Sequence, residues 1–180
     1  PTFVAVAGMA PDAGLTGVSY VRGGFFANAD SEARNEAIET NRSIIREANE
    51  LGLPLIVLVC GADPKQSLES SRAQITDALL RLAPRAADAG VVLGIEPLHP
   101  MYADTRSAVN TLGQANDIAE AVAHDSVQVV VDVYHLWWDR DFYAEIDRCG
   151  REGWLAAFHV CDWKLPTEDL LLDRGLMGEG

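Results

Sequence analysis

Short apolar runs alternate with longer amphipathic stretches from one end of the chain to the other. The apolar runs predict five strands, at Gly17–Arg22, Leu53–Cys60, Val91–Pro97, Val127–Tyr134 and Leu155–Val160. Two of these runs, LPLIVLVC and VQVVVDVY, consist almost entirely of Val, Ile and Leu. Such continuous runs are typical of strands that are buried on both faces of a parallel sheet.

Apolar residues at helical spacing predict a helix between each pair of successive strands. The expected helices are Ser31–Leu51, Leu68–Ala89, Thr105–Ala123 and Asp141–Cys149. Glycines follow three of them and are expected to end them, at Gly52, Gly90 and Gly150. Pro84 lies inside the second helix, and we expect a bend or an interruption before it because proline lacks the backbone donor.

Strands that alternate with helices over connections of this length predict right-handed crossovers and a parallel α/β sheet. Two architectures fit the pattern: an open doubly wound sheet and a closed (β/α)8 TIM barrel. A complete barrel needs roughly 250 residues, whereas this chain has 180. The barrel interpretation therefore predicts one incomplete barrel domain over residues 1–180, lacking its first strands and its last strand, with no recognisable strand in Pro1–Thr16.

Three of the predicted strands end in acidic and imidazole side chains, namely Glu96, Asp132 and His159. Ligands bind at the carboxyl ends of strands in barrels and open α/β sheets alike. Strand residues alternate between faces, so Glu96 shares its face with Val92, on an otherwise apolar surface. A carboxylate buried there must be paired, protonated or bound to a cation. Two carboxylates and one imidazole would suit Mn²⁺, Mg²⁺ or Co²⁺.

Each of these residues also has an ordinary structural interpretation. Glu96 alone could cap a helix or form an ion pair, and His135 alone could be a hydrogen-bonded core histidine. His124, near a predicted helix end, is given no functional role. Three tryptophans follow the Asp132 and His159 strands and could either form a sugar-stacking wall or simply pack; these are Trp137, Trp138 and Trp163.

The overall charge and the cysteines exclude several classes of protein. The net charge is -13, from 27 acidic and 14 basic residues, which disfavours binding to nucleic acids and to anionic membranes. No apolar run approaches the ~18 residues that a membrane span needs. The three cysteines, Cys60, Cys149 and Cys161, form no C-x-x-C motif. We therefore expect reduced thiols in a cytoplasmic protein.

Several motifs resemble those of the xylose-isomerase-like TIM barrels that act as sugar (phosphate) isomerases and epimerases. The matching stretches are RGGFF, GIEPLHPMYADTRSAVNTL, VVVDVYHLWWD, AFHVCDW and LLLDRGLMGEG, in this order. The acidic balance and the few histidines argue against endonuclease IV, which has the same fold. The lack of an H-x-H cluster argues against xylose isomerase itself.

The resemblance implies a divalent-metal site for Mn²⁺, with Mg²⁺, Co²⁺ or Zn²⁺ as alternatives. Its ligands would be Glu96, Asp132 and His159, with Glu96 also acting as the catalytic base. Family members use a second glutamate, which we expect from a strand after Gly180 because Glu179 lies in a GEG loop. His135 resembles the residue that binds a substrate hydroxyl. Weaker candidates for substrate contacts are His99, Arg22, Asp162 and Lys164. In typical epimerases an arginine follows the metal-binding histidine by a few residues, whereas here Arg174 lies further along the chain.

The resemblance also implies the reaction: a metal-polarised carbonyl and carboxylate-mediated proton transfer beside it, in a ketose or a sugar phosphate. A sugar dehydratase or a C-glycoside-cleaving lyase on the same scaffold would begin with the same step. A third alternative is a non-catalytic barrel fragment. Because an incomplete barrel leaves strand edges unpaired, we expect the chain to form homo-oligomers.

Overall fold

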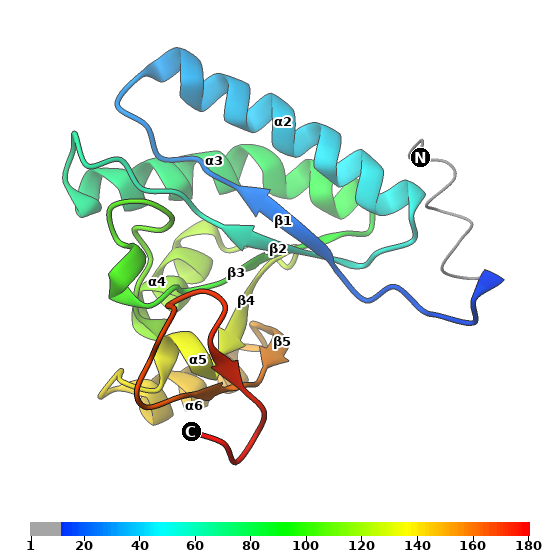
Figure 1. The fold of residues 1–180 in the computed structure, drawn as a ribbon. Coiled ribbons are helices and arrows are strands. Elements are labelled where there is room, and N and C mark those ends of the chain that lie inside the picture. Colours follow the sequence, from blue (N-terminus) through cyan, green and yellow to red (C-terminus); the bar gives the residue numbers. More distant parts are fainter. Residues whose placement is uncertain (1–11) are drawn as a thin grey trace.

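The computed structural model describes residues 12–180, and a five-stranded parallel sheet runs through it in the order β1-β2-β3-β4-β5 (Figure 1). Its strands are β1 (Tyr20–Gly24), β2 (Leu55–Val59), β3 (Val92–Ile95), β4 (Val127–Asp132) and β5 (Leu155–His159). Each strand pairs with the next one along the chain. A doubly wound sheet would reverse its strand order at a switch point, so this unidirectional order confirms the barrel type.

The helices pack on one face of the sheet, which is the outer face of the barrel wall (Figure 1). They are α2 (Ser31–Glu50), α3 (Leu68–Asp88), α4 (Leu112–Val122), the short α5 (Val133–Leu136) and α6 (Phe142–Glu152). The main core lies between them and the strands, with Ile56 and Leu58 of β2 fully buried in it. The alternate residues Leu55 and Val57 join Val130 in a small cluster on the inner face. Both faces of β2 are therefore apolar, as its continuous run predicts.

All five strands end one or two residues from their predicted ends. β1 continues through Gly23 and Gly24, which pair with Leu58 and Val59 of β2, whereas the prediction ended it at Arg22. β4 ends at Asp132 rather than Tyr134, because the Asp132 carboxylate accepts the backbone N–H of Tyr134 and begins α5. A local side-chain cap thus takes the place of two further strand residues.

Three of the predicted helix boundaries are also corrected. α4 starts after the cap Thr111, whose side chain accepts the N–H of Gln114, so residues 105–111 form a loop. α6 runs on through Gly150 and ends at Gly153, which adopts the left-handed conformation with φ of 72°. α3 is not interrupted at Pro84. The carbonyl that Pro84 leaves without its usual intrahelical partner belongs to Leu80, a residue that is 49% exposed.

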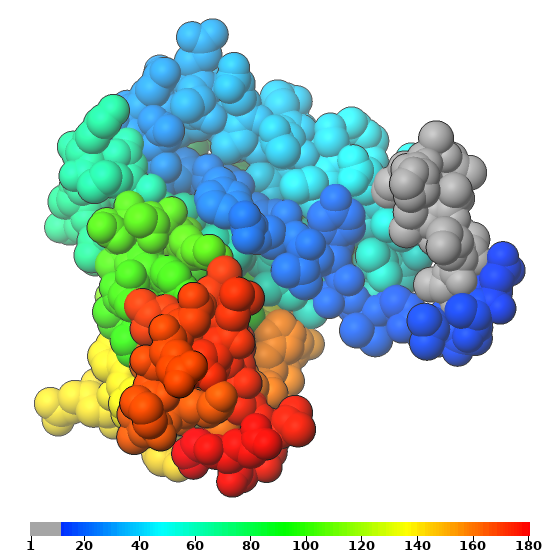
Figure 2. All heavy atoms as spheres, viewed as in Figure 1, coloured from blue at the N-terminus to red at the C-terminus, as the bar shows by residue number. Residues whose placement is uncertain are grey.

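A small antiparallel hairpin, which the sequence pattern did not predict, follows β5. It pairs β6 (Asp162–Trp163) with β7 (Arg174–Gly175). The loop between these strands lies against the rest of the chain, where the hydroxyls of Tyr102 and Tyr134 both donate to the carbonyl of Leu170. In Figure 2 this segment, in red, covers part of the green region, which includes the 3-10 helix η1 (Pro100–Tyr102). The hairpin therefore lies beside the carboxyl ends of the central strands.

Within residues 12–180, no helix combines the length and the hydropathy that crossing a bilayer would require. The prediction that Pro1–Thr16 contains no strand falls largely on residues 1–11, which lie outside the described part of the chain.

Candidate metal centre

Glu96, Asp132 and His159 come together at the carboxyl ends of three neighbouring strands. Glu96 directly follows β3, Asp132 is the last residue of β4, and His159 is the last residue of β5. One potential ligand atom from each residue lies within 4.8 Å of those from the other two. The register of the sheet produces this arrangement, since Asp132 is paired with His159 across β4 and β5.

The two carboxylates are close together and largely buried, with exposed fractions of 9% for Glu96 and 4% for Asp132. Burial raises the pKa of Asp132, and the negative charge of Glu96 raises it further. The N–H of Tyr134 and the charges of Arg174 and His159 act in the opposite direction. Glu96 Oε1 lies 2.9 Å from His159 Nδ1, and this hydrogen bond is the main reason that the pKa of His159 is raised.

This set of side chains fits a divalent cation. Two buried carboxylates repel each other, and a cation between them would offset both the repulsion and the cost of burial. Two oxygen donors and one nitrogen donor match the preference of Mn²⁺, Mg²⁺ and Co²⁺, and Zn²⁺ also accepts such donors. The buried Cys60 is not a competing soft ligand, because its thiol stays protonated. Burial, and to a smaller extent the negative charge of Glu96, raises the pKa of this thiol to about 12.

His135 lies next to the three residues, on the short helix α5, and is 4% exposed. Its Nδ1 accepts the backbone N–H of His99 at 3.3 Å. Burial, followed by the charges of Arg174, His99 and Arg106, lowers the pKa of His135 to about 3. The imidazole is therefore neutral at physiological pH. The structure brings His135 and His99 to the site, as the sequence predicted, but their contact with substrate stays a prediction.

Aromatic side chains form a wall beside these histidines. The ring of Trp163 lies 4.8 Å from that of Tyr134, in a stacked arrangement, and 5.0 Å from that of His99. Trp137 and Trp138 complete the group, the first 5.5 Å from Trp163 and the second 5.7 Å from His99. All three tryptophans of the sequence analysis thus gather at the site.

The remaining predicted contact residues are engaged elsewhere. The guanidinium of Arg22 lies over the ring of Phe25, at 5.0 Å. Asp162 accepts the backbone N–H groups of residues 178–180, and Lys164 pairs with Asp173 within the hairpin. Glu179 accepts the N–H of Leu176, so it does not provide a ligand to the site. No contact joins these side chains to the metal candidates among the described residues.

Arg174 was not among the predicted site residues, yet it reaches the centre from β7. Its Nη1 lies 3.5 Å from Asp132 Oδ2, and its Nη2 lies 3.4 Å from His135 Nε2. Its Cζ lies 4.1 Å from the centroid of the Tyr134 ring. The sequence analysis noted Arg174 within the motif LLLDRGLMGEG and as lying further along than the arginine of typical epimerases, but it did not predict the hairpin that carries this residue.

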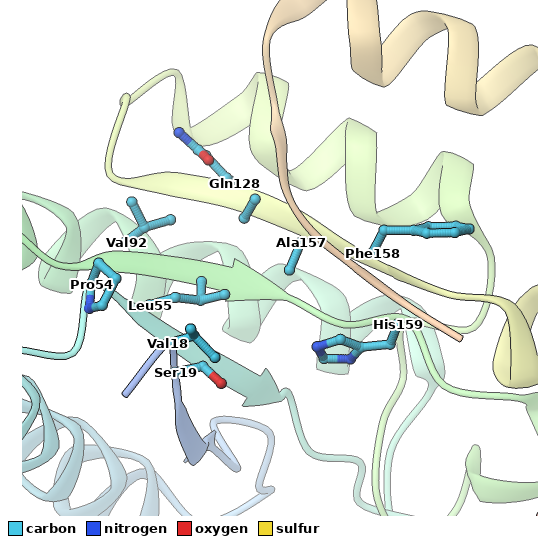
Figure 3. Close-up of a pocket in the computed structure, with 10 residues that line it drawn as sticks. Val18, Ser19, Pro54, Leu55, Val92, Gln128, Ala157, Phe158 and His159 are labelled. Carbon is cyan, nitrogen blue, oxygen red and sulfur yellow. The ribbon is translucent and has the colours of Figure 1, made fainter. Parts of the chain in front are cut away.

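A hollow of about 380 Å³ lies on the inner face of the sheet, and His159 is part of its lining. In Figure 3, Gln128 lies towards the upper left and His159 towards the lower right, with Ala157 between them. Of the three candidate ligands, His159 borders this hollow, and Glu96 and Asp132 do not.

Comparisons with known proteins point to one family. The sequence pattern described as "Xylose isomerase-like TIM barrel" matches residues 4–180. The inosose isomerase of Halalkalibacterium halodurans is 31% identical over 114 residues, which is 62% of this chain and 39% of that protein. The chain therefore matches about two fifths of the length of this curated relative.

Two solved structures show the same fold. Protein SMc04130 from Sinorhizobium meliloti 1021 is 42% identical with a TM-score of 0.93, over 99% of this chain and 66% of that one. The IOLI protein with a bound zinc atom is 22% identical with a TM-score of 0.78, over 98% of this chain and 64% of that one. With the strand order and the match over residues 4–180, these likenesses show that the chain belongs to the xylose isomerase-like TIM barrel family.

Proposed function

We propose that the protein is a divalent-metal-dependent isomerase or epimerase of a ketose or a sugar phosphate. The convergence of Glu96, Asp132 and His159 from three successive strands is the observation that carries this proposal. The family supports it, since the curated relative is an inosose isomerase.

Glu96, Asp132 and His159 would hold the metal, for which Mn²⁺ is our first choice and Mg²⁺, Co²⁺ or Zn²⁺ are alternatives. The IOLI protein, which has a similar fold, has a bound zinc atom, and this supports metal binding in the present chain. A bound divalent cation supplies Lewis-acid polarisation of a substrate carbonyl.

The side chains of this chain would bind the substrate and move the proton. Glu96 is the proposed base that removes the proton from the carbon beside the carbonyl. Its hydrogen bond to His159 fixes the direction of its carboxylate. Neutral His135 is buried and can donate to a substrate oxygen, and the aromatic wall around Trp163 can shield the site from water. We propose contacts with more distant parts of the substrate for four further side chains, namely His99, Arg22, Asp162 and Lys164.

Titration calorimetry with Mn²⁺ tests the metal site. We expect stoichiometric binding to the chelator-treated protein, weakened more than about 100-fold in Glu96→Gln, Asp132→Asn and His159→Gln, which exceeds the loss typical of an outer-shell partner. Asp77→Asn, at a carboxylate that is 70% exposed, is the matched control and should bind like the wild type. Equal affinity in all variants would contradict the assignment.

Proton exchange tests the reaction. Ketoses and ketose phosphates are incubated in D₂O with the Mn²⁺-loaded protein and followed by NMR. We expect deuterium at the carbon beside the carbonyl together with an isomer or epimer, and neither in Glu96→Gln. Loss of water from the sugar, or cleavage of a C–C bond, would instead assign the protein to the lyases.

We also propose that the chain forms homo-oligomers through the edge of β5. Leu155 and Phe158 are 50% and 56% exposed, beside a hollow lined entirely by apolar surface. An uncovered apolar strand edge of this kind favours pairing with another chain. Light scattering should give a mass of at least two chains, and Phe158→Lys should lower it; a wild-type monomer would contradict the proposal.

A further inference from the structure

The chain that follows β5 covers one side of the candidate site. We call residues 162–180, which include β6 and β7, the hairpin segment. His135, beside the metal candidates, is 4% exposed, and Arg174 of the hairpin segment lies 3.4 Å from its Nε2. A ligand can therefore reach this nitrogen only when the hairpin segment has moved aside.

Bonds within the hairpin segment fix its shape. Lys164 pairs with Asp173, and the Asp173 carboxylate also accepts the backbone N–H of Glu168. Asp162 accepts the N–H groups of residues 178–180, which ties the two ends of the segment together. All of these bonds survive a movement of the segment as a whole, so it can move as one body.

Several large apolar side chains of the hairpin segment point into solvent. Leu165, Leu172 and Leu176 are each at least 76% exposed. Trp163 does contact the rest of the chain, with its ring stacked 4.8 Å from that of Tyr134. Segments with few buried apolar side chains open at a low free energy, and the lids of binding sites are drawn from such segments. The place of this segment therefore depends on Trp163 and on specific polar bonds.

Two phenols supply such bonds. The hydroxyls of Tyr102 and Tyr134 donate to one carbonyl, that of Leu170, at 3.0 and 2.8 Å. A carbonyl oxygen has two lone pairs, so both bonds form at once. Tyr102 belongs to η1, which follows β3, and Tyr134 belongs to α5, which follows β4. The single carbonyl thus ties the hairpin segment, in red beside α5 in Figure 1, to two separate parts of the site.

We propose that the hairpin segment is a lid over His135, held closed by the hydroxyls of Tyr102 and Tyr134, and that substrate enters when these two bonds break. The inference rests on the proposed function, because it concerns the access of a sugar to that site. Tyr102 and Tyr134 are then positioning residues, since they act through the hairpin segment and touch no reacting atom.

Histidine labelling tests the lid. Chelator-treated protein without sugar is treated with diethyl pyrocarbonate, and mass spectrometry gives the labelling rate of each histidine. His135 reacts when the lid is open, so its rate follows the open population. Tyr102→Phe and Tyr134→Phe each remove one hydroxyl and keep the ring. We expect each variant to raise the His135 rate about 2- to 10-fold, as the loss of one hydrogen bond predicts.

Two controls separate lid opening from a general loss of stability. Tyr20→Phe removes a similar phenol bond, to Glu47 at 2.9 Å, between β1 and α2, and should leave the His135 rate unchanged. The thiol of Cys149, which is buried in the core, reacts only when the fold opens more widely. It should stay unreactive in all three variants.

Four results would overturn the lid. They are an unchanged His135 rate in both Tyr102→Phe and Tyr134→Phe, an equal increase in Tyr20→Phe, an increase accompanied by reaction of Cys149, and labelling of wild-type His135 as fast as that of the partly exposed His99. The labelling needs neither metal nor sugar, so it is independent of the proposed function. Protein that binds no Mn²⁺ contradicts the metal centre, whereas an unchanged His135 rate contradicts only the lid.

Discussion

Glu96 and His159 are 63 residues apart and lie on strands that do not pair, yet Glu96 Oε1 and His159 Nδ1 are 2.9 Å from each other. β4 lies between their strands, and its last residue, Asp132, completes the group. In a barrel wall, inward side chains from alternate strands meet in one layer. The contact is therefore a product of the curvature of the sheet.

The hydrogen bond from Glu96 is the first cause of the raised pKa of His159. In NMR titrations with chelator present, we expect the His159 ring signals to change at a midpoint above 6.5 and Glu96→Gln to lower that midpoint. The pKa of His159 is higher in the folded state than in the unfolded state. The stability that its contact with Glu96 contributes is therefore present below pH 6.5 and is lost as the pH rises through the folded-state pKa. An unchanged midpoint in the variant would show that the contact is absent in solution.

The pKa of His135 is shifted in the opposite direction, to about 3, chiefly by burial. Its ring signals should stay constant between pH 8 and pH 5, with His135→Gln giving the assignment. Protonation of His135 is unfavourable in the folded state. The free energy of unfolding should therefore decrease as the pH falls from 6.5 towards 3. A midpoint near 6.5 would mean that the ring is solvated.

Adjacent leucines on α3 provide a matched test of the core. Leu79 is fully buried and Leu80 is 49% exposed. Leu79→Ala should lower the free energy of unfolding by about 2–5 kcal/mol, through lost burial and the cavity left behind. Leu80→Ala should change it by less than about 0.5 kcal/mol. Urea denaturation measures both free energies of unfolding. Equal losses in the two variants would contradict the packing of α3 on the sheet through Leu79.

Gly24 ends β1 with φ of 112°, and a Cβ there would meet the backbone carbonyl of Val59. Asn41 holds this glycine through its backbone N–H and carbonyl, at 2.8 Å each. Gly52 also has a positive φ, 67°, but open space around it. Thermal unfolding should show Gly24→Ala to be more destabilising than Gly52→Ala by over about 1 kcal/mol, because it adds a steric clash and a φ further from the left-handed helical region. Similar losses would contradict the close pairing of β1 and β2.

The three cysteines should differ in reactivity towards a thiol reagent at pH 8. Cys60 and Cys149 are buried, and burial is the main cause that raises their pKa values to about 12 and about 11. Cys161 is partly exposed. We expect one thiol to react in the native protein and all three after denaturation, as counted by absorbance. Rapid reaction of two or three native thiols would be the contrary result.

The sequence predicted the interiors of the strands better than their ends. The Val, Ile and Leu runs of β2 and β4 mark buried strands because apolar burial is a local pattern. The ends depend on particular bonds, such as the Asp132 carboxylate that accepts the N–H of Tyr134 and starts α5. The hairpin that carries Arg174 was missed because each of its strands has two residues, too short for any periodicity.

By itself, the sequence determined the order of strands and helices and the placing of acidic and imidazole residues at strand ends, since both follow from local patterns along the chain. It also determined the family, through its motifs. Only the tertiary structure decided that Glu96 touches His159 and that Arg174 reaches Asp132 and His135. These contacts join residues far apart in the chain, and their distances depend on how the sheet curves and where the hairpin packs.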